Sequence, residues 1–294
     1  MTGTETAADD LVVNPQLTMR YGSVDQDLAR AMGETPPEDD GPVWMVNLMH
    51  YRPVAEYADG RPTELTGVQA DDLYAPLDSL AAVGARIVFL GEVETQLLGD
   101  APRWDRVAVV RYPTRRSFIE MQQRQDFVEH HVHKDAGMAA TIVAMGLPFA
   151  PPPVPADAPE LDQVPFPSTP DDPRIVVVHA IAFDREAADL ADSVESLRGY
   201  TEHAARIAVP HGVRIAGWFD CEGTIIGDGR RWDQVRFNAF PSRAAFMAVV
   251  QDPDRLEAQR ELREPAMSDT YTMIVRPLID ELAASWADED LEAS

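Results

Sequence analysis

Three of the seven histidines in this 294-residue chain fall within four positions, at His130, His131 and His133. A neutral imidazole near pH 7 is a natural general acid or base. On a helix, His130 and His133 lie three residues apart and share a face, whereas His131 points elsewhere. We therefore predict His130 and His133 as catalytic residues. The alternative interpretation is a polar, exposed helix end.

The same histidines do not predict a metal site. Two helical histidines supply only half of a site, and the chain has no His-Glu-x-x-His pattern. No glycine-rich phosphate loop follows a strand, so no nucleotide cofactor is expected. The sequence thus favours chemistry without a metal or an organic cofactor.

An internal repeat sets the framework that must position these residues. Aligning Gly84–Pro113 with Gly212–Pro241, without gaps, gives 11 identities in 30 positions at an offset of 128 residues. The shared core is Gly-Asp-x-x-Arg-Trp-Asp-x-Val, with Trp104-Asp105 in the first copy and Trp232-Asp233 in the second. A match at one fixed offset indicates two related structural units. We assign Asp105 and Asp233 a structural role, capping a turn, with each tryptophan closing one end of the fold.

Hydrophobic periodicity and helix-end residues predict the order strand, helix, strand, strand, helix, strand in each copy, which is the ferredoxin-like arrangement. Strands are expected at 43–51, 86–98, 104–112 and 141–145, and again at 174–183, 213–226, 232–240 and 269–276. Helices are expected at 71–83 and 114–137, then at 186–208 and 242–265, with a last helix at about 277–286. A short helix at 25–32 would be capped by Ser23 and ended by Gly33.

These elements divide the chain into five parts. Residues 1–42 are an acidic N-terminal extension, 43–147 the first repeat, 148–173 a linker with ten prolines, 174–279 the second repeat, and 280–294 an acidic tail. A ferredoxin-like sheet covers one face with its helices and leaves the other bare, and a bare face must be buried. We therefore predict an α+β fold in which two tandem units close one intramolecular dimeric α/β barrel around a cavity. The chain would be a monomeric pseudo-dimer or a homodimer.

Period-two alternation predicts which residues line that cavity. Val107 and Val109, like Val235 and Phe237, form an apolar face that we expect beneath the helices. The opposite, polar and aromatic face would bind the ligand. The predicted substrate-binding residues are Asn47, Arg86, Trp104, Arg106, Tyr112, His179, Trp218, Arg236 and Asn238. Glu92, Asp220 and His179 are the fallback catalytic candidates. For any one of these residues, the alternative is a rim salt bridge or ordinary core packing.

The excess of acidic residues argues against nucleic acid and anionic membranes as partners. The chain has 25 basic and 50 acidic residues, with the acidity concentrated in residues 1–42, 148–173 and 280–294. Nucleic acid and anionic membranes need a basic footprint, so neither is expected. The single cysteine, Cys221, and the lack of a signal peptide or long apolar run favour a cytoplasmic protein.

The repeated Gly-Asp-x-x-Arg-Trp-Asp-x-Val segment, followed by Tyr/Phe-Pro-Thr/Ser-Arg, resembles the DUF1330-like branch of the dimeric α/β-barrel superfamily. The run from His130 to Met138 is similar to that branch's His-x-His-Arg-x-Ala-Gly-Leu segment, with Lys134 in place of Arg. The resemblance covers 43–147 well and 174–279 more loosely. The resemblance implies a family of single units that dimerise, and it implies that this chain contains two such units fused into one. Haem-degrading members of the superfamily use an Asn on the first strand, a Trp on the third strand and a His on the second helix. Asn47, Trp104 and His130 or His131 are the similar residues here. The longer Trp-to-His distance in this sequence argues against haem.

Two classes of function remain open. The first is a cofactor-independent acid–base enzyme, of the cyclase, isomerase or lyase type, acting on an aromatic or polyketide-like carbonyl compound in the barrel cavity. Cofactor-free oxygenation of the substrate's carbanion is a related alternative. The second is a non-catalytic small-molecule binding or accessory protein.

Overall fold

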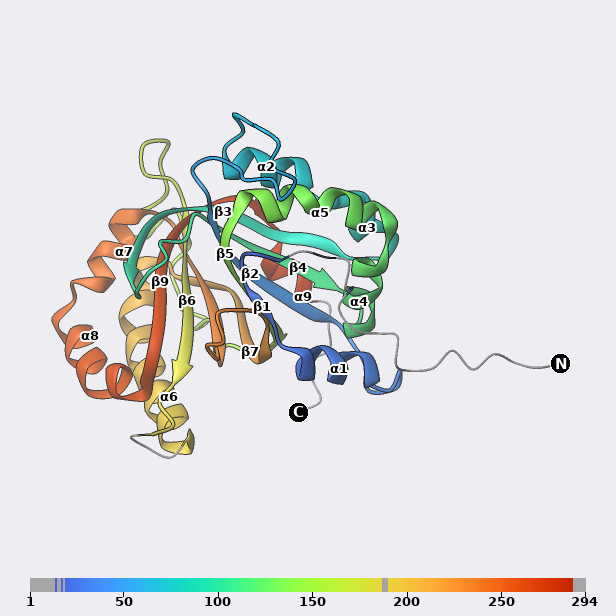
Figure 1. The fold of residues 1–294 in the computed structure, drawn as a ribbon. Coiled ribbons are helices and arrows are strands. Elements are labelled where there is room, and N and C mark those ends of the chain that lie inside the picture. The colour runs from blue at the N-terminus through green and yellow to red at the C-terminus, as the bar shows by residue number, and fades with distance from the viewer. Residues whose placement is uncertain (1–13, 15–16, 18, 187–189, 288–294) are drawn as a thin grey trace. The chain divides into compact units, whose positions relative to one another are not determined.

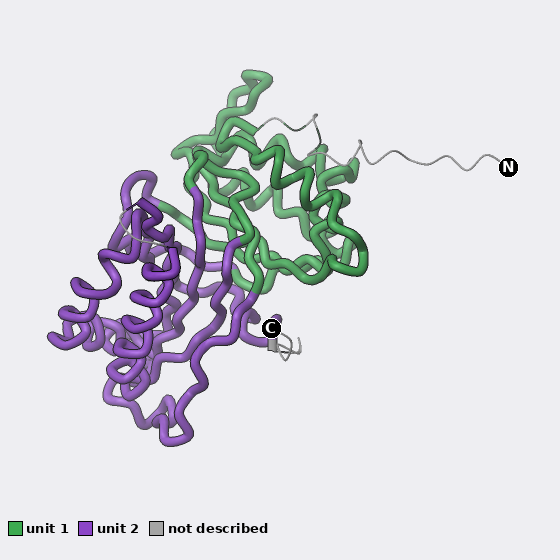
Figure 2. The backbone as a smooth tube through the Cα atoms, turned by 90° about the horizontal axis from the view of Figure 1, so that it is seen from below, with its two compact units in different colours: residues 1–89, 104–147, 222–230 green, residues 90–103, 148–221, 231–294 purple. Residues whose placement is uncertain are grey.

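The computed structural model describes residues 14, 17, 19–186 and 190–287, which form an α+β protein built on antiparallel strands (Figure 1). The chain divides into two compact units (Figure 2). Unit 1 comprises residues 1–89, 104–147 and 222–230, and unit 2 comprises 90–103, 148–221 and 231–294. The predicted extension and tail lie partly outside the described residues. No helix within the described ranges is long and apolar enough to cross a lipid bilayer.

Unit 1 follows the predicted order of elements. Its elements are β1 (Ser23–Val24), α1 (Gln26–Glu34), β2 (Val43–Tyr51), α2 (Gly67–Tyr74), α3 (Leu77–Ala82), the first residues of β3 (Arg86–Leu98), β4 (Arg106–Tyr112), α4 (Arg115–Gln123), α5 (Gln125–Gly137) and β5 (Met138–Pro148). Strand β2 lies between β4 and β5 and is antiparallel to both.

Unit 2 has the same order after the linker. Its elements are β6 (Ile175–Phe183), α6 (Leu190–Ala208), the short turn η2 (Val209–His211), most of β7 (Arg214–Gly227), β8 (Gln234–Phe240), α7 (Arg243–Val250), α8 (Pro253–Ala258), the π-helical turn η3 (Gln259–Arg263), η4 (Glu264–Ala266), β9 (Met267–Asp280) and α9 (Leu282–Ala287). Strand β6 lies between β8 and β9, antiparallel to both, and β7 pairs with β8.

The repeated aspartates make the same hydrogen bonds in both units. Asp105 accepts from the backbone N–H of Tyr51, and Asp233 accepts from that of Phe183, each at 2.8 Å. In turn the backbone N–H of Asp105 donates to Met49, and that of Asp233 to Ile181. Both carboxylates therefore fasten the end of a central strand, in keeping with the predicted structural role.

Several predicted boundaries are wrong for identifiable reasons. Asp25, not Ser23, caps α1, because its carboxylate accepts from two N–H groups of the first turn, and the helix runs past Gly33 to Glu34. The helix expected at 71–83 is two helices, since Pro76 interrupts it. Strand β9 continues to Asp280, so the last helix begins at Leu282 rather than near 277.

In both units, the face of the strands that packs against the helices is the opposite of the predicted one. Tyr112 packs edge-on against Phe118 of α4, with ring centres 5.3 Å apart, and Phe240 packs against Phe246 of α7 at 5.2 Å. The polar and aromatic face therefore lies beneath the helices. The apolar face tolerates complete burial, as at Phe237, because it has no polar groups that need partners.

Candidate functional site

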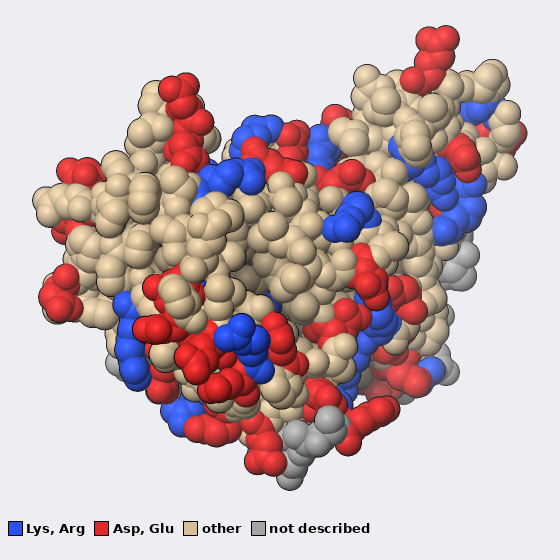
Figure 3. Space-filling model, turned by 90° about the vertical axis from the view of Figure 1, so that its left-hand side faces the viewer, with Lys and Arg blue, Asp and Glu red and all other residues tan. Residues whose placement is uncertain are grey.

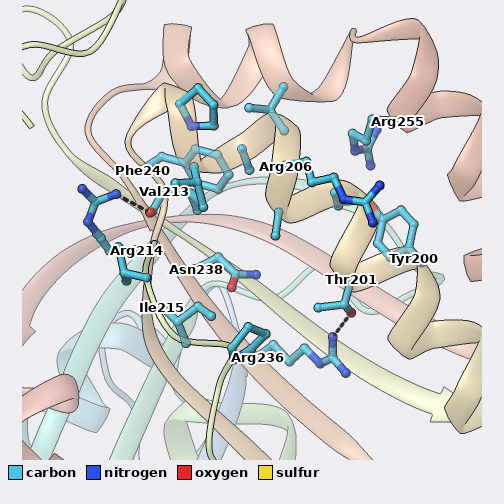
Figure 4. Close-up of a pocket in the computed structure, with 18 of the residues that line it drawn as sticks. Tyr200, Thr201, Arg206, Val213, Arg214, Ile215, Arg236, Asn238, Phe240 and Arg255 are labelled. Carbon is cyan, nitrogen blue, oxygen red and sulfur yellow. Dashed lines mark hydrogen bonds between the residues drawn. The ribbon is translucent and has the colours of Figure 1, made fainter. Parts of the chain in front are cut away.

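A cavity of about 510 Å³ lies within unit 2, between α6 and the sheet formed by β6, β8 and β7 (Figure 4). Helix α6 presents Thr201, Ala204 and Ala208 to it, at spacings of three and four residues that place them on one side. Because these side chains are small, helix and sheet do not fill the space between them. The volume suits a small organic molecule.

The proline-rich linker borders this cavity through residues 152–155 and 157–159. Arg214 of β7 holds the linker in place by donating from Nη2 to the carbonyl of Pro159 at 2.8 Å. Phe149 donates its backbone N–H to the carbonyl of Trp218 at 3.1 Å, and the two rings lie 5.6 Å apart. The linker is therefore part of the cavity wall.

Four of the predicted substrate-binding residues line this cavity together: His179, Trp218, Arg236 and Asn238. The register explains why they meet, since His179 and Trp218 both pair with Arg236, which lies two residues before Asn238 on β8. Residues directly opposite one another on antiparallel strands lie side by side on one face. The prediction placed them inside a barrel, whereas they lie on the helix side of the sheet.

His179 is a neutral imidazole in this setting. Burial lowers its pKa well below the usual histidine value, and the positive charges of Arg263, Arg236 and Arg255 lower it further. Nδ1 lies 3.1 Å from the hydroxyl of Thr272. With Nδ1–H donating to that hydroxyl, Nε2 keeps a free lone pair and is able to accept a proton.

Arg236 is fixed beside His179 by neutral partners. Its Nε and Nη2 donate to the side-chain oxygen of Gln234, and Nη1 donates to the hydroxyl of Thr201 at 2.8 Å, a pair visible in Figure 4. Its guanidinium carbon lies 4.5 Å from the ring centre of Trp218, and Trp218 donates from Nε1 to Asn238 at 3.0 Å. Burial lowers the pKa of Arg236 to about 10, which leaves it charged at neutral pH.

Sequence reasoning missed Arg263, which also lines the cavity. It ends the π-helical turn η3 and is only 4% exposed. Its guanidinium lies 5.9 Å from the ring centre of Tyr200. Such π-helical turns often occur at functional sites, but no sequence pattern considered above identifies this one. The repeat offset of 128 residues places Lys134 opposite Leu262, so a shift of one residue in the alignment is the signal that could have found Arg263.

The corresponding region of unit 1 is filled by its own side chains. Tyr51 of β2 donates to the carboxylate of Asp71 at 2.6 Å, and Arg106 pairs with Asp72 at 2.7 Å and with Asp71 at 3.8 Å. Burial raises the pKa of Asp71, while the hydrogen bond from Tyr51 opposes that rise. Arg106, predicted to bind substrate, is thus engaged within unit 1.

Lys134 lies in this filled region of unit 1. Its ammonium nitrogen is 5.0 Å from the ring centre of Tyr74 and 5.7 Å from that of Tyr21. Burial lowers the pKa of Lys134, and the nearby Asp71 carboxylate acts in the opposite direction. Tyr21 also bonds to Nε2 of His131 at 2.8 Å, so a residue of the N-terminal extension helps to fill the space.

The three histidines of the cluster contact three different partners. His130 is exposed, and its Nδ1 lies 2.8 Å from the carbonyl of Asp126 on its own helix. His133 is partly buried, with Nδ1 2.7 Å from the Tyr57 hydroxyl. His131 is the buried member of the cluster, and burial lowers its pKa to about 4.

The remaining predicted site residues are dispersed in unit 1. Asn47 donates its side-chain amide to the carbonyl of Met45 in its own strand, at 2.9 Å. Arg86 is exposed at the start of β3, whereas Trp104 and Tyr112 are buried. The structure therefore gathers the candidates of the second repeat and not those of the first.

Metal and haem binding find little support in the side chains themselves. Among the described residues, no three His, Cys, Asp or Glu side chains come together in a way that could hold a metal ion. Of the haem-type candidates, His131 bonds to Tyr21 and His130 bonds within its helix. Since both histidines are engaged by these contacts, we derive no step through haem.

Comparison with known proteins gives only distant similarities. No protein-family model matches the chain, and a search of curated proteins gives no match. Among solved structures, a protein of unknown function from Rhodopseudomonas palustris is 28% identical over 45% of this chain and 98% of its own, with a TM-score of 0.39. A candidate monooxygenase from Fusobacterium nucleatum is 9% identical, covering 81% of this chain and 93% of its own, with a TM-score of 0.45. A variant of chlorite dismutase from Candidatus Nitrospira defluvii is 14% identical, covering 83% and 95%, with a TM-score of 0.44. All three TM-scores are below 0.5, so these similarities identify no activity for this chain.

Proposed function

We propose that this chain is a cofactor-independent enzyme that performs acid–base chemistry on a small carbonyl compound bound in the unit 2 cavity. The observation that carries this proposal is the pairing of His179 with Arg236 across β6 and β8, both facing the same cavity. A proton acceptor and a cation side by side are what enolate formation requires.

In the proposed reaction, Nε2 of His179 accepts a proton from the carbon next to the substrate's carbonyl group. The electron pair of that C–H bond moves to the carbonyl oxygen and forms an enolate. Arg236 and the amide of Asn238 stabilise the oxygen, because donors aimed at a developing charge lower the barrier most. Return of the proton from the imidazolium to a different carbon completes an isomerisation. In a cyclisation the enolate carbon instead attacks a second carbonyl carbon of the substrate, and the imidazolium protonates the alkoxide that forms. In a lyase step the enolate expels a β-substituent, which leaves with the proton from the imidazolium.

The cavity walls favour an aromatic or polyketide-like substrate. Trp218, Tyr200 and Phe240 line it together with aliphatic side chains from α6 and α7. Flat, apolar rings bury well against such aromatic walls. This proposal moves the chemistry from His130 and His133, the residues predicted from the sequence, to His179.

Two alternatives use the same cavity. A cofactor-free monooxygenase would form the same carbanion and pass electrons from it to oxygen, so it would consume oxygen in proportion to substrate. A non-catalytic binding or accessory protein would hold its ligand unchanged. The depressed pKa of His179 favours this second alternative, because a weak base is a poor proton acceptor until a bound anion raises its pKa.

Hydrogen–deuterium exchange tests the enzymatic proposal. The protein is incubated with 2-acetonaphthone in deuterated buffer, and loss of the methyl proton signal is followed by NMR. We expect exchange above the buffer rate, falling about a hundredfold or more in His179→Asn, which installs the residue found at the equivalent place in the first repeat. His130→Asn is the matched control and should retain the full rate. Undiminished exchange in His179→Asn would move the chemistry elsewhere.

We also propose that the chain is a tandem fusion of two DUF1330-like units that closes a single barrel. Support comes from the matched Asp105 and Asp233 hydrogen bonds and from the composition of the compact units. Unit 2 includes residues 90–103 of the first repeat, and unit 1 includes residues 222–230 of the second. A reciprocal exchange of this kind is expected of two units that fold together. A cytoplasmic location and a monomeric or homodimeric state remain predictions.

A further inference from the structure

The unit 2 cavity is cationic within a strongly acidic chain. The chain carries a net charge of −25, and acidic side chains are spread over the face shown in Figure 3. Yet the cavity lining contains five arginines, and Asp157 is the one acidic residue among its described members; the arginines are Arg206, Arg214, Arg236, Arg255 and Arg263. This local excess of positive charge favours the binding of an anion.

Arg263 is the least compensated of these arginines. Its side chain is almost fully buried, and in the described part of the chain its Nη2 has no hydrogen-bond partner. Burying a guanidinium without an anion is energetically unfavourable, and buried arginines are ordinarily paired. The ring of Tyr200 beside it offers a π face but no carboxylate.

Arg236 also has N–H donors available for a ligand. Its hydrogen bonds go to a neutral amide and a neutral hydroxyl, and it forms no ion pair among the described residues. A guanidinium has five N–H donors, so two remain for a ligand after these three bonds. Burial lowers the pKa of Arg236, the Asp220 carboxylate opposes that change, and the charge of Arg263 lowers the pKa further, so the two guanidinium groups are close enough to repel each other.

Unit 1 has a partly buried cation, Lys134, at the position equivalent to Arg263. Met138 pairs with Tyr51 and Met267 pairs with Phe183, each just beyond a bulge in the central strand. Four residues before these methionines stand Lys134 and Arg263, so the two cations are equivalent. The Asp71 carboxylate acts on the pKa of Lys134 and is itself partly buried in the same region. The carboxylate that acts on the pKa of Arg263 is that of Glu264, which is exposed, accepts a hydrogen bond from Gln259 and forms no ion pair with Arg263 among the described residues.

We infer that the unit 2 cavity binds the carboxylate of an aromatic or polyketide-like carboxylic acid between Arg263 and Arg236. The ligand's carboxylate provides the negative charge that Asp71 provides in unit 1. The apolar part of the ligand lies against the aliphatic and aromatic walls of the cavity. This inference rests on the proposed function for the site and for the carbon skeleton of the ligand. It adds the charged group that the ligand must carry.

A carboxylate fits better than a phosphate for two reasons. A planar carboxylate matches the fork of a guanidinium and accepts two hydrogen bonds at once. Its single charge is also easier to bury in a cavity walled by Leu197, Val213 and Phe246 than the near-double charge of a phosphate monoester. Once bound, the anion would also raise the pKa of His179, which improves it as a base.

Calorimetric titration with 2-naphthoate and its neutral isostere 2-naphthamide tests the inference on the full-length chain. We expect 2-naphthoate to bind at least about tenfold more tightly than 2-naphthamide, because charge-assisted hydrogen bonds supply the difference. Arg263→Met should remove that preference. Arg198→Met, on the exposed surface of α6 and outside the cavity, removes the same charge and should keep it. Equal binding of the two probes by the wild type overturns the inference.

Thermal unfolding separates ligand binding from a structural role. Because the ligand-free protein buries the Arg263 charge without an anion, ligand-free Arg263→Met should melt at the same temperature as the wild type or higher. A lower melting temperature combined with unchanged 2-naphthoate binding would show that Arg263 is structural, and would overturn the inference.

The inference and the proposed function fail in different ways. Preferential binding of 2-naphthoate without any exchange of 2-acetonaphthone would support the carboxylate site and reject the enzyme. Exchange that depends on His179, without any preference for 2-naphthoate, would reject the carboxylate site and leave the enzyme.

Discussion

The two units treat one position of the fold differently. In unit 1 the space between sheet and helices holds Tyr21, Tyr51 and Tyr74, with Asp71 beside the cation Lys134. In unit 2 the equivalent cation, Arg263, borders an open cavity that offers no carboxylate to pair with it among the described residues. The first unit thus supplies its own counter-charge, and the second leaves that place to a ligand.

The comparison shows that a repeated architecture does not repeat its chemistry. Asp105 and Asp233 are conserved between the copies because each fastens the end of a strand, which both units need. Asn47 and His179 occupy the same register position, yet one bonds to its own strand and the other lines the cavity. Residues that differ between the copies are therefore the better guide to function.

The largest predicted effect concerns the fusion itself. Residues 43–147 expressed alone lack the 222–230 segment that belongs to unit 1 and would expose an apolar sheet face. We expect aggregation or a homodimer, to be measured by size-exclusion chromatography with light scattering. A stable, well-folded monomer would contradict the proposed fused barrel.

A second prediction uses the two neighbouring histidines of α5. His131 has a pKa of about 4 in the folded protein, below its unfolded value near 6.5, so the folded state binds fewer protons. Its contribution to stability is complete above pH 6.5 and is lost as the pH falls from 6.5 towards 4, by roughly 3 kcal/mol in total. Urea unfolding at pH 7 and pH 5 should show about 2 kcal/mol of this loss.

The matched variants isolate the contribution of His131. His131→Gln, which keeps an acceptor for Tyr21, should unfold with a weaker pH dependence than the wild type. His130→Gln, at an exposed site on the same helix, should retain the full dependence. An identical pH dependence in wild type and His131→Gln would contradict the neutral, buried state of His131.

A smaller effect is expected from breaking the internal charge balance of unit 1. Asp71→Leu leaves the buried hydroxyl of Tyr51 without its acceptor and should cost about 1–3 kcal/mol in urea unfolding. Asp72→Leu removes a more exposed carboxylate from Arg106 and should cost about 1 kcal/mol or less. Equal losses in the two variants would show that Asp71 has no special place in the cluster.

Much of the fold could be predicted from the sequence, because strands β2 and β3 and the order of elements follow from local patterns. Period-two alternation also grouped His179, Trp218, Arg236 and Asn238, which do lie together. It could not tell which face meets the helices, because alternation separates the two faces of a strand without showing what packs on each.

The prediction of the site residues was limited for a different reason. A cluster of histidines in sequence is conspicuous, but neighbouring helical residues point in different directions, and His130 points to solvent. Arg263, by contrast, stands among other charged residues in an ordinary helical pattern. Its burial results from the π-helical turn η3, a local irregularity that residue types alone do not reveal.

The most direct test of the account is to follow the imidazole signals of all seven histidines by NMR while 2-naphthoate is added. We expect the His179 signal to shift on binding and its pKa to rise, because a carboxylate held by Arg236 and Arg263 stabilises the imidazolium. The signals of His130 and His133 should stay unchanged. Shifts at His130 or His133, with none at His179, would contradict the assignment of the ligand site to unit 2.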